Sequence, residues 1–212
     1  MVRGFGVLSI SAVLLAGGVL TGCGDTSTND DGDASPGSAS PTESASASGS
    51  ADGYVEASAE GPAQNVPKPS KPAVADEESV EGAQAFLDYL SDARAYAQQT
   101  GDTSLAREVT AEECYSCLNL YDTIDDLYEQ GGWGSRGYEK VTVLSDTLPA
   151  DSYGFYAPKA SVEAETLTFW DPDGNVVDEA SGDEFSDEGL LIHLDYRDGH
   201  WTYITAAPLE QR

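Results

Sequence analysis

The chain has 212 residues, and its 38 Asp and Glu against 10 Lys and Arg give a formal net charge of −28 at pH 7. The excess continues through the C-terminal part, where 30 acidic and 7 basic residues lie from Asp76 onward. This charge argues against a nucleic-acid partner and against docking on anionic lipid head groups. It suits a well-solvated extracellular domain, with a cationic partner as the alternative.

The first 22 residues have the pattern of a bacterial signal peptide. Arg3 is the one charge before Asp25, and an apolar stretch follows over residues 5–20. That stretch is shorter than the roughly 20 apolar residues of a membrane-spanning helix. Small residues, Thr21 and Gly22, then precede Cys23, as signal peptidases require.

The sequence Leu20-Thr21-Gly22-Cys23 resembles the bacterial lipobox. The resemblance implies that Cys23 receives a diacylglyceryl group and becomes the first residue after cleavage. Two acyl chains anchor a protein stably without a transmembrane helix. The expected location is therefore the outer face of the cytoplasmic membrane, with the membrane as a partner. The alternative is an ordinary secretory signal followed by an unrelated cysteine.

Residues 23–78 predict a disordered linker. They consist mainly of Ser, Ala, Gly, Thr, Asp and Pro, with too few large apolar residues to form a core. Four prolines over residues 62–72 favour an extended, stiffer end. The simplest role of such a segment is to hold a domain away from the membrane. From residue 79 to 212 the composition predicts one domain of ordinary size.

That domain opens with helices. A helix is expected to start near Ser79 and stop at Gly101, since apolar residues recur between them at spacings of three and four. A short helical piece follows over residues 103–109. Thr110 and Glu113 have the spacing of a capping box, which predicts the start of a third helix that ends at Gly131-Gly132.

Cys114 and Cys117 lie in the first turn of that third helix. In an oxidising compartment, with Cys23 lipidated, these two cysteines are expected to pair as a structural disulfide. Redox chemistry is the alternative, but such pairs usually follow a strand within a βαβ unit, which is missing here. A metal site is not expected, because no second Cys pair or nearby His completes a ligand set.

Beyond Gly134 the alternation of side chains predicts strands. They are expected over residues 138–144 and 160–170, with a bulge near Glu165-Thr166, and over residues 175–179. Asp198-Gly199 predicts a tight hairpin between residues 190–197 and 200–206. Its register would pair Tyr196 with Trp201 and Leu194 with Tyr203.

Helices followed by antiparallel strands predict an α+β fold, with the N-terminal helices packed on a curved sheet. The order of elements and the closing hairpin resemble the nuclear-transport-factor-two-like cone, also called the SnoaL-like fold. Four segments further resemble a family of actinobacterial lipoproteins with an uncharacterised domain. They are residues 82–86 (GAQAF), 100–102 (TGD), 114–117 (CYSC) and 131–132 (GG). This resemblance implies a fold and no assigned activity.

His193 and Asp195 are the candidate catalytic residues. They share one strand face, and cone-fold enzymes often use a His with a carboxylate that orients it. The pair lies opposite the face of Leu194 and Tyr196, so a solvated position is the stronger expectation. Asp171, Asp173 and Asn175 resemble the start of a calcium loop, but Gly182 stands where a bidentate Glu is needed. A hairpin turn explains them better.

Aromatic residues are more numerous than a minimal core needs. In a cone fold they can line a pocket, with phenol groups as polar contacts. The candidate pocket residues are Tyr121, Tyr128, Tyr196, Trp201 and Tyr203. No cofactor is expected.

Three functions are therefore open. The first is a non-catalytic, lipid-anchored module that binds a small molecule or an envelope protein. The second is a cone-fold enzyme that uses His193 and Asp195. The third is a structural envelope protein without a pocket. An open aromatic pocket that excludes both His193 and Asp195 would argue against the second.

Overall fold

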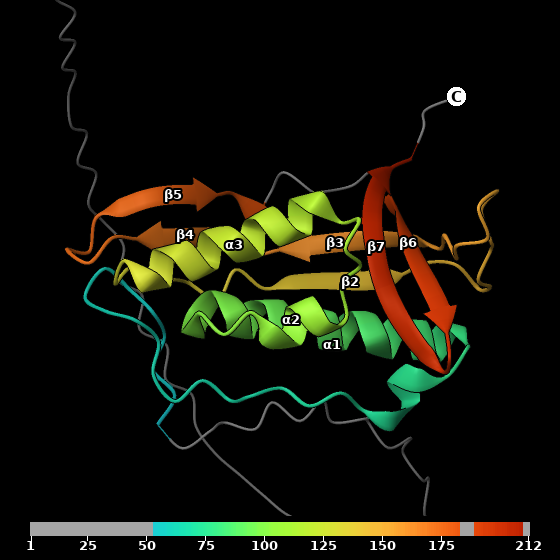
Figure 1. Ribbon diagram of the computed structural model, residues 1–212, viewed down its shortest axis with the longest axis horizontal. Coiled ribbons are helices and arrows are strands. Elements are labelled where there is room, and N and C mark those ends of the chain that lie inside the picture. The colour runs from blue at the N-terminus through green and yellow to red at the C-terminus, as the bar shows by residue number, and fades with distance from the viewer. Residues whose placement is uncertain (1–52, 183–188, 210–212) are drawn as a thin grey trace, which may run out of the picture. The chain divides into compact units, whose positions relative to one another are not determined.

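The structure, a computed structural model, describes residues 53–182 and 189–209. The predicted signal peptide, Cys23 and most of the predicted linker lie outside these residues. Helices come first in the chain and antiparallel strands follow, which confirms the α+β class (Figure 1). The elements are the 3-10 helix η1 (Ala73–Asp76), the helices α1 (Val80–Thr100), α2 (Ser104–Glu108) and α3 (Tyr115–Glu129), and the strands β1 (Trp133–Gly134), β2 (Glu139–Val143), β3 (Lys159–Ala164), β4 (Leu167–Trp170), β5 (Val176–Ala180), β6 (Leu190–Arg197) and β7 (His200–Pro208).

Helix α1 has the predicted ends. The Ser79 side chain accepts a hydrogen bond from the backbone N–H of Gly82 at 2.9 Å, which satisfies one donor of the first turn. At the other end Gly101 adopts φ 76° and its N–H donates to Ala97 O. A left-handed residue of this kind stops a helix, and glycine adopts it without strain.

The capping box predicted for α3 does not form. Thr110 donates its hydroxyl hydrogen to Ala106 O at 2.8 Å, within the turn that ends α2. Helix α3 starts five residues later, at Tyr115, and Cys114 occupies the N-cap. A threonine hydroxyl can donate to the carbonyl four residues before it as readily as it can accept from an N–H after it. The spacing of Thr110 and Glu113 alone therefore does not determine whether a capping box forms.

The strands form two antiparallel sheets, with the orders β1-β4-β5 and β2-β3-β6-β7. The single long strand predicted over residues 160–170 is interrupted at Glu165-Thr166 and contributes β3 to one sheet and β4 to the other. The change of side-chain phase was located correctly, but its cause is a change of sheet and not a bulge. The backbone N–H of Glu165 donates to Tyr138 O at 2.9 Å at the crossing point.

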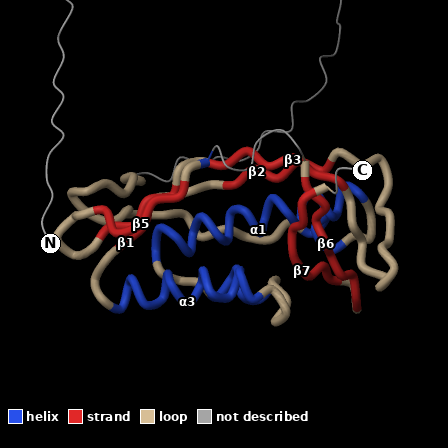
Figure 2. The backbone as a smooth tube through the Cα atoms, turned by 90° about the horizontal axis from the view of Figure 1, so that it is seen from above, coloured by secondary structure: helices blue, strands red, loops and turns tan. Residues whose placement is uncertain are grey.

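The β6–β7 hairpin has the predicted register. Tyr196 pairs with Trp201 and Leu194 with Tyr203, and both turn residues, Asp198 and Gly199, have positive φ. The hairpin is steeply inclined to β2 and β3 in Figure 1. Figure 2 shows β2 and β3 on one side of α1 and α3 on the other, so α1 is central to the domain. The main core joins α1 to the hairpin through Phe86, Leu87, Leu90, Ile192, Leu194 and Trp201.

The described structure begins before the predicted boundary at residue 79, and its first residues contact the domain. Trp133 Nε1 donates to Ser58 O at 2.8 Å, and Trp201 Nε1 donates to Glu77 O at 2.9 Å. The Tyr196 hydroxyl donates to Asp76 O at 2.8 Å. Residues 53–78 have too few apolar side chains to fold alone, but aromatic donors of the domain bind their backbone. Amino-acid composition cannot predict contacts that a segment makes with residues far away in the sequence.

Gly82 allows this segment to lie close to α1. A Cβ at this position would lie 2.0 Å from the carbonyl oxygen of Glu77. Alanine is the better helix former by about 1 kcal/mol, yet the overlap forces the backbone to move. We expect Gly82→Ala to lower the free energy of unfolding by about 2 kcal/mol, measured by urea denaturation. Glu81→Ala, at the exposed neighbouring position, is the control, and equal stabilities of the two variants would contradict the close approach.

Candidate functional site

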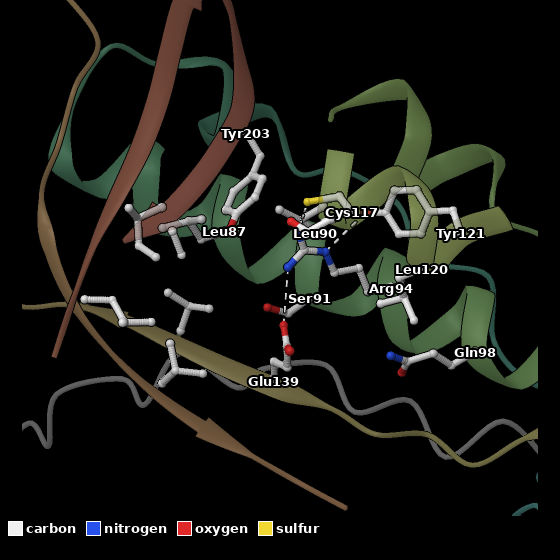
Figure 3. Close-up of a pocket in the computed structure, with 16 residues that line it drawn as sticks. Leu87, Leu90, Ser91, Arg94, Gln98, Cys117, Leu120, Tyr121, Glu139 and Tyr203 are labelled. Atoms are coloured by element: carbon white, nitrogen blue, oxygen red, sulfur yellow. Dashed lines mark hydrogen bonds and ion pairs between the residues drawn. The ribbon is translucent and has the colours of Figure 1, made fainter. Parts of the chain in front are cut away.

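A cavity of about 250 Å³ lies between α1, α3 and the four-stranded sheet (Figure 3). Half of its lining residues are aliphatic and the wall is mainly apolar, which makes it a surface for an apolar molecule. The aliphatic residues are Leu87, Leu90, Leu120, Val141, Val162, Leu190, Ile192 and Ala206. Polar side chains occupy only part of the wall, namely Ser91, Arg94, Gln98, Ser116 and Glu139.

Arg94 is the centre of the polar part. Its side chain is only 15% exposed, and its Nη1 donates to Glu139 Oε2 at 3.3 Å. Its Nε donates to the Tyr121 hydroxyl at 3.2 Å, and its Nη2 donates to Cys117 Sγ at 3.6 Å. The guanidinium also lies 4.6 Å from the centre of the Tyr203 ring. One cation thus joins α1, α3, β2 and β7 around the cavity.

The Tyr121 hydroxyl continues this network away from the cavity. It lies 3.2 Å from Thr110 Oγ1, whose own hydrogen is donated to Ala106 O. Tyr121 must therefore donate to Thr110 while it accepts from Arg94. The loop that carries Thr110 is bound to β7, since Ala111 N donates to Tyr203 O at 2.8 Å. Both tyrosines are consequently fixed against Arg94.

Burial and charge act in opposite directions on the groups of this network. Burial lowers the pKa of Arg94. The neighbouring Tyr121, Tyr203 and Glu139 raise this pKa by more than burial lowers it, so the net shift is upward. Burial also raises the pKa of Tyr203, against the opposing effect of Arg94. Arg94 therefore stays cationic and Tyr203 stays a neutral phenol at physiological pH.

Gln98 lies one helical turn beyond Arg94 and is only 4% exposed. Its Oε1 is buried and has no hydrogen-bond partner among the described residues. An unsatisfied buried acceptor costs about 1–3 kcal/mol. Figure 3 shows the Gln98 amide directed to the side of the cavity that holds Arg94 and Glu139. Its backbone is fixed from behind, because the Tyr128 hydroxyl donates to Gln98 O at 2.9 Å.

The cysteine pair forms part of this wall. Cys114 and Cys117 are joined as predicted, with an S–S distance of 2.08 Å. Cys114 is 3% exposed, whereas Cys117 is partly exposed and lines the cavity. The bond holds the first turn of α3 beside Arg94.

His193 and Asp195 do not meet. His193 Nδ1 lies 3.2 Å from Asp151 Oδ2, and Asp195 accepts from Arg197 Nε at 2.7 Å. Neither residue lines the cavity. Three hydrogen bonds, two from the backbone N–H groups of Tyr153 and Phe155 and one with His193, lower the pKa of Asp151 against a raising effect of burial. The candidate His–Asp pair therefore does not form in this structure, because each of the two side chains contacts another residue.

The predicted aromatic residues fall into three places. Tyr121 and Tyr203 line the cavity. Tyr128 lies behind Gln98, where burial raises its pKa to about 12. The Trp201 ring contacts the rings of Tyr196 and Tyr156, with ring centres 4.7 Å and 5.3 Å apart. Tyr196 and Trp201 serve the contact with residues 76–77, because a buried ring needs a partner for its N–H or O–H.

Sequence reasoning missed the polar residues of the cavity, Ser91, Arg94, Gln98 and Glu139. A signal was present for the first three. With Leu87 they lie at spacings of four, three and four, so they share one face of α1. A charged side chain on the face of a helix that turns toward the core indicates a buried polar site.

Within residues 53–182 and 189–209, no group of three or more His, Cys, Asp and Glu side chains is arranged to hold a metal ion. In the same residues no helix is both long and apolar enough to cross a membrane.

The fold and the site define a class: an α+β protein with a mainly apolar cavity that is lined in part by one buried arginine. Residues 52–207 match the family of unknown function DUF6318, and the chain belongs to that family. The match starts close to residue 53, where the described structure starts, and includes residues 52–78 of the segment predicted to be the linker. No curated protein and no solved structure matches the chain.

Proposed function

We propose that this protein is a lipid-anchored, extracytoplasmic binding module whose cavity takes a small, mainly apolar molecule. The observation that carries the proposal is the cavity itself, which has a volume of about 250 Å³ and a mainly apolar wall. A buried arginine and a glutamine amide whose oxygen has no partner among the described residues also line it. A protein without a ligand would gain by filling this space with its own side chains, since interiors are close-packed.

The lipobox at Cys23 supports the anchor and the location, and the acidic charge supports exposure to solvent. The relation to actinobacterial lipoproteins and to the nuclear-transport-factor-two-like cone is part of the same proposal. Its support is the order of elements, helices before antiparallel strands, together with a cavity between them. The binding role is favoured over the structural one because a cavity is present, and over the enzyme because His193 and Asp195 are both outside it.

Filling the cavity should abolish binding. Ser91 lines it and is 4% exposed, so the larger side chain of Ser91→Leu would occupy the space of a ligand. We expect the full chain, purified under native conditions and then denatured, to release a small molecule that mass spectrometry detects. Ser91→Leu is expected to carry at least about tenfold less of it.

Ser152→Leu is the matched control, because Ser152 is exposed and lies outside the cavity. Ala206→Phe is a second cavity variant, at an exposed position of β7 that tolerates a larger residue. The proposal is contradicted if both cavity variants fold, as judged by circular dichroism, and release the same compound in the same amount as Ser152→Leu.

A further inference from the structure

Arg94 and Gln98 present complementary polar groups to the same space. Residues four apart on a helix have Cβ atoms about 5–6 Å apart, so one small polar group of a ligand can reach both. Arg94 has five N–H donors and makes three hydrogen bonds with described side chains, one of them to sulfur. Gln98 Oε1 is a buried acceptor without a partner. A ligand at this point needs an acceptor for Arg94 and a donor for Gln98.

The charges of the wall favour an uncharged ligand. Arg94 Nη1 and Glu139 Oε2 are 3.3 Å apart, so the two opposite charges nearly cancel for any group that lies farther away. An anionic head group on Arg94 would lie beside the Glu139 carboxylate, in a domain that is already strongly acidic. A cationic head group would face the guanidinium of Arg94. A neutral group avoids both repulsions.

The terminal amide of Gln98 carries a donor and an acceptor side by side. A second amide is its natural complement, since the two groups can form a pair of N–H···O=C hydrogen bonds. The pairing holds whichever way the Gln98 amide is turned, because exchange of its oxygen and nitrogen only reverses the ligand's orientation. The aliphatic part of the wall then receives the apolar remainder of the molecule.

We infer that the cavity takes an uncharged amphipathic amide, whose polar group lies between Gln98 and Arg94 and whose aliphatic part lies against the apolar wall. This inference rests on the proposed function, because it names the ligand class of the same cavity. The cavity as a binding site is tested separately by the Ser91→Leu comparison.

The test compares four probes with one aliphatic chain: octanamide, octanoate, octylammonium and 1-octanol. Each is titrated into the purified full chain near neutral pH by isothermal titration calorimetry. We expect octanamide to bind at least about tenfold more tightly than the other three. Gln98→Leu should lose this preference for octanamide over 1-octanol and still bind both. Gln130→Leu, which removes an exposed glutamine at the end of α3, is the control and should keep the preference.

The wild-type comparison decides even if Gln98→Leu does not fold. Tighter binding of octanoate or of octylammonium overturns the inference and assigns a charged ligand. Equal binding of octanamide and 1-octanol overturns it as well, and leaves an apolar binding site. If none of the four binds, the ligand class is wrong, and the compound released from the wild type but not from Ser91→Leu then shows whether the cavity binds anything.

Discussion

Replacing Arg94 with methionine is expected to lower the free energy of unfolding by about 3 kcal/mol, because removal of one partner from a buried ion pair usually costs about that much. Methionine fills much of the same volume but offers no hydrogen-bond donor. Glu139, only 34% exposed on its side chain, then loses its cation, and the Tyr121 hydroxyl loses its donor. The contact of the guanidinium with the Tyr203 ring is lost too. Because these partners come from α3, β2 and β7, the variant weakens the whole arrangement around α1.

Urea unfolding followed by tryptophan fluorescence measures this change. Arg136→Met is the matched control. Arg136 forms an ion pair with Glu165, and the two side chains are 44% and 49% exposed. Exposed pairs contribute about 1 kcal/mol or less, so the control should stay near the wild type. A loss for Arg94→Met as small as that for Arg136→Met would show that Arg94 does not hold the wall of the cavity together.

Replacing Cys23 with alanine is expected to move the protein from the membrane fraction to the released fraction almost completely. The proposed diacylglyceryl group is attached to the Cys23 sulfur, and alanine has no atom that can accept it. Two acyl chains hold a protein at a membrane, and among the described residues no helix is long and apolar enough to replace them. Cell fractionation followed by detection of the protein measures the change, and intact mass reports the missing lipid.

The double variant Cys114→Ala/Cys117→Ala is the control for this experiment. It also removes cysteine sulfur, but from the disulfide of the domain. It should therefore stay with the membranes. If Cys23→Ala also stays there, and its mass differs from that of the wild type only by the exchange of cysteine for alanine, the protein is held by some means other than a lipid on Cys23.

Local features of the fold could be predicted from the sequence because their causes are local. A serine cap and a glycine stop bound α1, and Asp198-Gly199 determines the register of the hairpin. The pairing of Cys114 with Cys117 follows from three-residue spacing on a helix. In each case the interacting groups lie within a few residues of one another.

Features that depend on distant partners were missed. The break at Glu165-Thr166 marks a passage between two sheets, which alternation alone cannot distinguish from a bulge. Thr110 bonded backward to Ala106 because α2 supplied a carbonyl. The cavity was expected among the aromatic residues, but Tyr196 and Trp201 bind the backbone of residues 76–77 instead. Its polar residues, apart from Glu139 on β2 and Ser116 on α3, come from α1, where only their position on the inward face distinguishes them.

The hydrogen bonds of Tyr196 and Trp201 to residues 76–77 also affect how the domain responds to a pulling force. If the chain is tethered at Cys23, any pull from the cell wall or from a bound partner enters the domain through residues 53–78. That load first meets the hydrogen bond from the Tyr54 hydroxyl to Gln99 Oε1 and the Trp133–Ser58 bond. It then meets the Lys68–Asp102 ion pair, and last the bonds of Tyr196 and Trp201. These contacts lie one after another along the segment, so a pull would load them in turn. As these contacts open in turn, the segment would lengthen the tether while the cavity keeps its shape.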